Sequence, residues 1–347
     1  MIKKISISEF LSLADSVPVF DVRSPGEYHH AHIPGAYPLP LFTDEERAIV
    51  GTAYKQQGKQ PAVKIGLDYF GPKMKSIIEE VERILASVSP QQNKIVVHCW
   101  RGGMRSAGVA WLLDLYGYEV QTIVGGYKAF RTWALQIFQQ ELRFRVLGGY
   151  TGSGKTYIIQ SLLNKHQPAI DLEGIAQHKG SAFGAIGMPP QPSQEMFENQ
   201  LALAIYHQTK QHPNQPIWIE DESQRIGSVN IPHLLWATIR KQQVIFIDIP
   251  FAERVKHIVS EYGSLEKEKL IVAVSRIEKR FGPNETKMTI QDLNEDRIES
   301  AFSQLLKYYD KAYEKSLFNR ENIALLLQKK PFDNVNADFI SESLTSL

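Results

Sequence analysis

Short apolar runs alternate along the first part of the chain with stretches in which apolar side chains recur at helical spacing. The run Lys94–His98 is typical of a buried strand, and residues 106–116 continue from it with the pattern of a helix. Further strands are predicted at residues 17–23 and 118–124, and helices just after residue 24 and at 74–87. Strands and helices in alternation predict an α/β domain with a parallel sheet.

The same alternation resumes after a helical stretch at about residues 127–141. A strand at 144–147 leads into glycine-rich sequence and a helix at 157–164, and more strands are predicted at 169–171, 217–219 and 244–248. The Gly/Pro-rich segment 180–192 has the composition of a loop that covers a substrate. The chain is therefore expected to form two α/β domains, residues 1–135 and 136–347, joined by the helix at about 127–141.

The composition is that of a folded protein. Of 347 residues, 43% are hydrophobic and 22% are charged, which excludes a disordered chain. No apolar run approaches the roughly 18 residues of a membrane span, and the N-terminus has no signal-peptide pattern. We therefore expect a cytoplasmic protein without a membrane partner.

The net charge of +1 gives no general argument for a nucleic-acid partner. Between positions 47 and 75, however, six basic residues face a single acid, Asp68. Two interpretations stay open: a solvated loop, or a local site for a phosphate backbone. The basic residues are Arg47, Lys55, Lys59, Lys64, Lys73 and Lys75.

Cys99 is the only cysteine, which excludes an intramolecular disulfide and a zinc site built from cysteines. It follows a predicted strand and precedes a predicted helix, where backbone N–H groups converge at the positive end of the helix dipole. Gly102 and Gly103 allow the tight turns of such a loop, and Arg101 and Arg105 add cationic donors. A thiol in these surroundings ionises readily, so Cys99 is a candidate nucleophile.

A second phosphate-binding motif lies between the strand at 144–147 and the helix at 157–164. It matches G-x-x-x-x-G-K-[ST] and reads Gly149-Tyr150-Thr151-Gly152-Ser153-Gly154-Lys155-Thr156. In a P-loop of this kind the amides of residues 151–155 cradle a diphosphate and Lys155 reaches its outer oxygens. Thr156 is a candidate Mg²⁺ ligand, and its acidic partner is expected in Glu220-Asp221-Glu222, with Asp221 and Glu220 favoured over Asp171.

The segment 178–188 is a candidate for the rest of the substrate site. It places apolar Phe183, Ile186 and Met188 near the cation of Lys179. This combination suits an apolar group carried on a diphosphate as well as it suits a nucleobase, so both ligands stay open at this point.

The first domain resembles the rhodanese domain over residues 1–135. The resemblance rests on the cysteine loop, residues 98–106, and on further segments on either side of it: Asp21-Val-Arg23, Glu27-Tyr28, His32-Ile33-Pro34-Gly35-Ala36, Gly117-Tyr118, Val124-Gly125-Gly126-Tyr127 and Trp133. The spacing Cys99-x5-Arg105 is one residue longer than in the usual sulfurtransferase loop and is similar to rhodanese-like dual-specificity phosphatases. Loop length therefore leaves sulfur, selenium and phosphate chemistry open.

The whole chain resembles the tRNA 2-selenouridine synthase family, a rhodanese domain fused to a P-loop domain. Segments of the second domain support this: 178–184, 191–198 and 219–227. The resemblance implies a tRNA substrate with 2-thiouridine at the wobble position, S-geranylation from geranyl diphosphate, and replacement of the geranylthio group by selenium from selenophosphate. It also suggests a selenophosphate-producing enzyme as a partner. Our hypothesis gives the diphosphate to the P-loop and makes Cys99 the selenium-carrying nucleophile.

Two other functions fit the motifs. A phosphatase-like or sulfurtransferase Cys-x5-Arg domain could be fused to a small-molecule kinase, although the loop offers no aspartate as a general acid. Alternatively, the chain could be a nucleotide-sensing module whose first domain only binds an anion.

Overall fold

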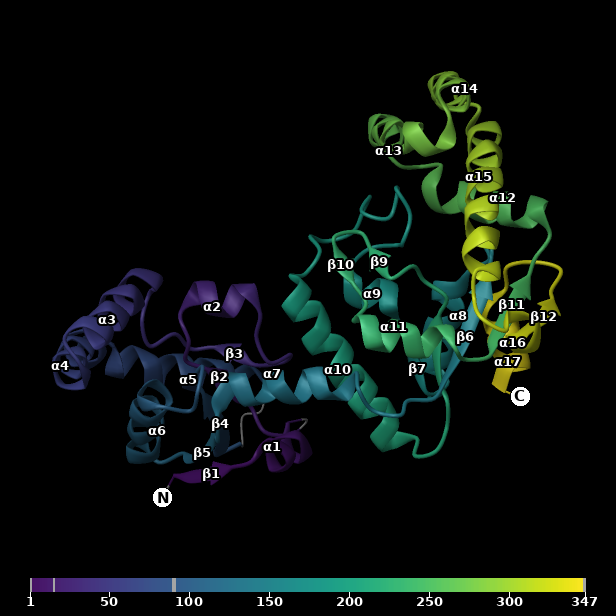
Figure 1. Cartoon of the computed structure of the whole chain (residues 1–347). Helices are drawn as coiled ribbons and strands as arrows, with labels where there is room; N and C mark the ends of the chain where they lie inside the picture. Colours follow the sequence, from purple (N-terminus) through teal and green to yellow (C-terminus); the bar gives the residue numbers. More distant parts are fainter. Residues whose placement is uncertain (1, 15, 89–91, 346–347) are drawn as a thin grey trace. The chain divides into compact units, whose positions relative to one another are not determined.

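The computed structural model describes residues 2–14, 16–88 and 92–345 of the chain. These residues form two compact units, Met1–Gln136 and Ile137–Leu347. Each unit contains a five-stranded sheet whose strands are all parallel. The predicted α/β fold class is confirmed, with helices packed around both sheets (Figure 1).

The first sheet has the strand order β1-β5-β4-β2-β3. Its strands are β1 (Lys3–Ile5), β2 (Val19–Asp21), β3 (Tyr37–Pro38), β4 (Lys94–His98) and β5 (Glu119–Ile123). The helices of this unit are α1 (Ile7–Leu13), α2 (Pro25–His30), α3 (Asp44–Gln56), α4 (Lys59–Phe70), the 3₁₀ turn η1 (Gly71–Lys73), α5 (Met74–Val88), α6 (Met104–Tyr116) and α7 (Gly126–Ile137).

The central strands carry apolar side chains on both faces because helices cover both faces of a parallel sheet. Ile95, Val96 and Val97 of β4 are fully buried. This burial fixes the end of β4, and with it the position of Cys99 directly after the strand. The helix predicted at 127–141 is observed as α7, which ends at Ile137, where the Gln140 N–H bonds the Ile137 carbonyl and closes a turn.

The basic segment 47–75 is helical, so its interpretation as a loop is wrong. Helices α3 and α4 pack on each other, and α3 begins with a capping box formed by Thr43 and Glu46. Three of the six cations are in ion pairs, whereas Lys55, Lys59 and Lys64 are exposed. The pairs are Arg47–Glu27, Lys73–Glu46 and Lys75–Glu79.

The second sheet has the strand order β12-β11-β6-β8-β7. Its strands are β6 (Phe144–Gly149), β7 (Ala169–Ile170), β8 (Ile217–Glu220), β11 (Val244–Asp248) and β12 (Leu327–Pro331), and β9 (Arg225–Ile226) pairs with β10 (Val229–Asn230) in a separate hairpin. The helices are α8 (Lys155–Asn164), α9 (Leu172–Ala176), α10 (Gln194–Gln211), α11 (His233–Arg240), α12 (Phe251–Tyr262), α13 (Lys267–Phe281), α14 (Pro283–Asn294), α15 (Ile298–Phe318), α16 (Ile323–Leu326) and α17 (Ala337–Thr345).

Helices α12 to α15 form a helical subdomain with an apolar core of its own, beyond the layers that cover the sheet (Figure 1). Leu270, Val274 and Leu305 are buried in this core, and Phe183 of the predicted loop 180–192 joins it. The loop is thereby attached to the subdomain. No helix in the described part of the chain is both long and apolar enough to cross a membrane.

Candidate active site

Cys99 lies at the carboxyl end of β4 with its thiol almost fully buried; 3% of the residue is exposed. The Gly103 N–H donates to Cys99 Sγ at 3.3 Å, and the Ser106 hydroxyl oxygen lies 3.3 Å from the same sulfur. Burial disfavours the thiolate, but the Ser106 hydrogen bonds, the charge of Arg105 and the Gly103 N–H outweigh it and lower the pKa of Cys99. The loop thus stabilises the nucleophilic form of the sulfur.

The two arginines of the cysteine loop have different surroundings. Arg105 is half-buried and its guanidinium group bonds the Glu27 carboxylate, with 2.6 Å between Nη1 and Oε2. Glu27 also accepts the Ser24 N–H at the start of α2, so it fixes the position of Arg105. Arg101 is exposed. Within this loop, therefore, Arg105 acts on the thiol from a fixed position, and Arg101 faces solvent.

Two glycines allow the cysteine loop to pack against the start of α7. Gly102 and Gly126 both have positive φ, +65° and +56°. A Cβ on Gly126 would lie 2.2 Å from the Cys99 carbonyl oxygen, and one on Gly102 would lie 2.6 Å from the Ile123 carbonyl oxygen. The Tyr127 N–H donates to that Cys99 carbonyl at 2.9 Å. Only glycine fits either position without displacing the loop.

A buried ion pair between Arg23 and Asp21 stabilises the surroundings of the cysteine loop. Arg23, 1% exposed, bonds the Asp21 carboxylate at 2.6 Å and the Ala31 carbonyl at 2.7 Å. Its guanidinium carbon also lies 3.9 Å from the ring centroid of Tyr127. Arg23 therefore ties β2 to the same end of α7 that holds the cysteine loop.

The P-loop follows β6 directly, as its motif predicts. Gly149, Gly152 and Gly154 have positive φ, which shapes the turn, and α8 begins at Lys155. Lys155 Nζ donates to the Gly149 carbonyl at 3.0 Å and lies 5.8 Å from the ring centroid of Tyr313. The lysine is thus folded back over the loop, where a bound phosphate would lie.

The structure pairs Thr156 with a different acid from the one expected. The Thr156 hydroxyl donates to Glu173 Oε2 at 2.5 Å. Asp221 instead forms a buried ion pair with Arg320 and accepts the Tyr313 hydroxyl at 2.7 Å. An aspartate already bound by a cation and a phenol is less suited to coordinate a metal, so Glu173 replaces Asp221 as the acid beside Thr156.

Three glutamates near the P-loop have raised pKa values: Glu173, Glu220 and Glu222. Burial raises the pKa of Glu222 to about 8, and the charge of Glu173 adds to this. Burial likewise raises the pKa of Glu173, against the opposing effects of Thr156 and Lys155. A Cβ added at Gly180 would lie 2.7 Å from Glu222 Oε2 and 3.1 Å from Glu173 Oε1, so the carboxylates of Glu173 and Glu222 approach the same point. The two acids therefore converge, and each makes ionisation of the other less favourable.

A cavity of about 1060 Å³ extends from the P-loop. The loop residues Thr151, Gly152 and Gly154 to Thr156 line one part of it, and side chains of the helical subdomain line another. Lys179 and Phe183 both line the cavity. Lys179 bonds Glu261 at 2.7 Å, and Phe183 is only 4% exposed because it packs in the apolar core of the subdomain. Phe183 therefore anchors the loop, and most of its surface is not free for a ligand. Ser153 is the one residue among 151–156 that does not line the cavity, and its side chain is buried.

Several residues of this site were not found from the sequence. Arg254 donates to the Thr151 carbonyl at 3.0 Å and bonds Asp310, which ties the P-loop to α12 and α15. Tyr313 accepts the Gly149 N–H at 3.2 Å. Glu173 was detectable in principle, because it closely follows a predicted strand, and the carboxyl ends of parallel strands form the ligand edge of a sheet.

Comparison with known proteins defines the class of each part. Residues 6–132 match the rhodanese-like domain, and residues 142–339 match the tRNA 2-selenouridine synthase AAA domain. Proteins with the name tRNA 2-selenouridine synthase are similar to most of the chain. The one from Shewanella denitrificans is 37% identical over 279 residues, which cover 79% of this chain and 72% of that protein. The chain belongs to the tRNA 2-selenouridine synthase family.

Two other relatives with the same name extend the comparison. The Nitrosomonas europaea protein is 38% identical over 256 residues, or 73% of this chain, and the Bdellovibrio bacteriovorus protein is 39% identical over 252 residues, or 71% of this chain. In both cases the matched region spans 65% of the relative's length.

Proposed function

We propose that this chain converts 2-thiouridine at the wobble position of tRNA into 2-selenouridine, through an S-geranyl intermediate. The observation that carries the proposal is the cavity of about 1060 Å³, which joins a phosphate-binding loop to an apolar wall. Met188 and Ile277, which are half-buried, belong to this wall. A ligand with a diphosphate at one end and a hydrocarbon at the other, such as geranyl diphosphate, matches that distribution.

In the first step the thione sulfur of the base attacks the first carbon of the geranyl group. The carbon–oxygen bond breaks, pyrophosphate leaves, and the base loses its N3 proton. Lys155 and the P-loop amides stabilise the charge that develops on the departing pyrophosphate. Alkylation turns a poor leaving group into a better one, which prepares C2 of the base for the second step.

Mg²⁺ fits this site. Thr156, Glu173 and Glu222 would offer oxygen ligands of the kind that Mg²⁺ prefers. Burial is the main cause of the raised pKa values of the two glutamates, and a bound cation would favour their charged form. The ion would offset part of the diphosphate charge. Glu173 takes the role that the sequence had suggested for Asp221.

In the second step Cys99 carries selenium. Its thiolate attacks the selenium of selenophosphate, and the selenium–phosphorus bond breaks with its electron pair left on phosphorus, as phosphite. The resulting perselenide attacks C2 and displaces geranylthiolate. A small-molecule thiol then attacks the Cys99 sulfur, which releases selenouridine, and a second thiol regenerates Cys99. External thiols are required because the chain has no second cysteine.

The cysteine loop supports this role. Arg101 and the Gly102 amide would bind the oxyanion of selenophosphate, while the Gly103 amide donates to the Cys99 sulfur and Arg105 is held beside the thiol by Glu27. A selenophosphate-producing enzyme would be the natural supplier. The reaction belongs in the cytoplasm with its tRNA substrates.

The purified chain tests the proposal directly. Thiolated tRNA is incubated with geranyl diphosphate, selenophosphate and a thiol, and the nucleosides are analysed by mass spectrometry. We expect S-geranyl-2-thiouridine first and 2-selenouridine later, with phosphite released. If selenouridine forms with phosphate as the product and Cys99 never gains a selenium atom, selenium attacks C2 directly and the carrier role of Cys99 is excluded.

A further inference from the structure

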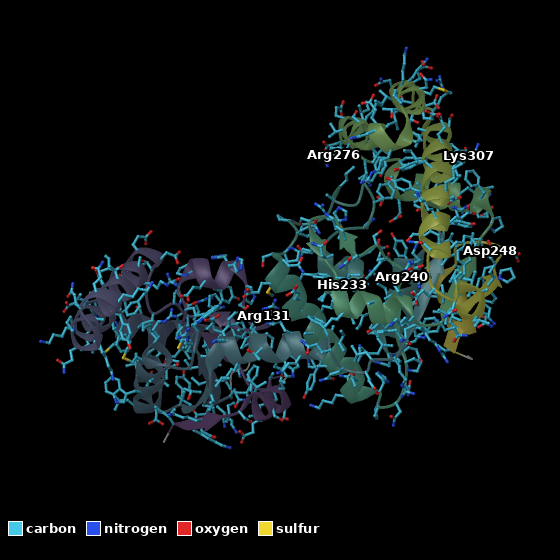
Figure 2. All side chains as sticks on the ribbon, in the orientation of Figure 1. Arg131, His233, Arg240, Asp248, Arg276 and Lys307 are labelled. Atoms are coloured by element: carbon cyan, nitrogen blue, oxygen red, sulfur yellow. The ribbon has the colours of Figure 1, made fainter. Side chains whose placement is uncertain are left out.

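Two arginines line the P-loop cavity at a place that the proposed chemistry does not use. Arg276 and Arg280 lie one helical turn apart on α13, and both border the cavity. Figure 2 labels Arg276 on this helix. Both side chains are exposed, and within residues 2–14, 16–88 and 92–345 neither guanidinium group forms an ion pair or a hydrogen bond. Their charges are therefore available to a ligand.

Helix α15 shows where these arginines lie relative to the P-loop. Tyr313 accepts the Gly149 N–H and so marks the phosphate end of the cavity. Tyr309 accepts the Ala182 N–H, and the ring of Tyr308 lies 5.2 Å from Phe281 at the end of α13. At 1.5 Å per residue, the five residues from Tyr308 to Tyr313 span about 7.5 Å along the helix axis.

The other cations of the cavity have partners or a role. Lys155 bonds the P-loop, Lys179 is paired with Glu261, and Arg225 donates to the Gly227 carbonyl. The end of α13 meets α15 at Tyr308, about 7.5 Å along the helix axis from Tyr313 at the P-loop. The two arginines are therefore available to a second anion, separate from the diphosphate.

The spacing of Arg276 and Arg280 along α13 indicates what kind of anion they would bind. Side chains at positions i and i+4 of a helix start about 6 Å apart, which suits neighbouring phosphates of an extended single strand. Arginine forms paired hydrogen bonds with phosphate, and the half-buried ring of Tyr308 offers an aromatic surface beside them. A base that leaves its stack to reach a buried site carries its flanking phosphates with it.

We propose that Arg276 and Arg280 bind the phosphate backbone of the single-stranded RNA segment that flanks the reacting base, with Tyr308 beside them. The inference rests on the proposed function, since it assigns the RNA entrance of the same cavity. It makes α13 the element that positions the anticodon loop while the P-loop holds the diphosphate.

The test measures binding of a synthetic anticodon stem–loop RNA with 2-thiouridine at the wobble position to the full chain at several salt concentrations. The double variant Arg276→Ala with Arg280→Ala should weaken RNA binding about tenfold and reduce the salt slope by about 1.4, the value for two phosphates of a single strand. Binding of geranyl diphosphate should change less than twofold. A variant with Arg276→Lys and Arg280→Lys should keep most of the RNA affinity.

The matched control is Lys279→Ala with Lys287→Ala, which removes the same charge from α13 and α14 at exposed positions that do not line the cavity. It should leave the salt slope unchanged. The inference is overturned if the arginine variant binds RNA as the control does, or if geranyl diphosphate binding falls as much as RNA binding. If the unaltered chain binds no RNA, the proposed function itself fails.

Discussion

Arg105 and Glu27 are 78 positions apart in the sequence, yet their side chains form a 2.6 Å ion pair at the edge of the cysteine loop. The pair fixes the guanidinium group that helps to lower the pKa of Cys99, and it explains why that group is not free to follow a substrate. The exposed Arg101 has that freedom.

Arg105→Gln should raise the pKa of Cys99, because it removes a cation and leaves the Glu27 charge less compensated. Ultraviolet absorbance of the thiolate as a function of pH measures this directly, since Cys99 is the only cysteine. Arg101→Gln is the control and should shift the midpoint less. Equal shifts in both variants would contradict the role of Arg105.

Gly126→Ala should destabilise the first unit by about 2 kcal/mol or more, because its Cβ would collide with the Cys99 carbonyl at a positive φ. Chemical denaturation measures the loss. Gly103→Ala is the matched control, because its φ is negative and no atom lies within 4 Å of the added Cβ. A loss of stability no greater than that of the control would show that the loop does not depend on this contact.

Glu222 should make the second unit less stable as the pH rises. Its pKa is about 8 in the folded chain against an ordinary 4.5, so between these values the folded state holds a proton that the unfolded state has released. The free energy of unfolding therefore falls as the pH rises through this window. Glu222→Gln should make the dependence less steep, although Glu173 and Glu220 with their raised pKa values still contribute to it, and Glu278→Gln on α13 should leave it unchanged. Identical slopes in Glu222→Gln and the unaltered chain would refute the assignment.

Lys55, Lys59 and Lys64 are exposed on the hairpin of α3 and α4, and we predict that they contact the tRNA backbone. Changing all three to Glu should weaken tRNA binding and lower its salt dependence. Reversing Lys75 and Lys94, which are paired with Glu79 and Glu119, provides a comparison on the same unit. Unchanged affinity and salt slope in the triple variant would exclude this surface.

The sequence predicts the sheets better than the contacts of the site. The strands Lys94–His98 and Val244–Asp248 occur where their apolar runs predict them, because full burial leaves a continuous local pattern. The acid beside Thr156 is different. It depends on how β7 and β8 pair in the sheet, and that register is a long-range property. The local pattern could suggest Asp221 but could not show that Arg320 neutralises it.

The division of labour between the two sites is the central claim, and nucleoside mass spectrometry of thiolated tRNA tests it most directly. Cys99→Ser should still produce S-geranyl-2-thiouridine and no selenouridine. Lys155→Ala should fail to geranylate but should convert tRNA that is already geranylated. Selenouridine formed by Cys99→Ser would contradict the account.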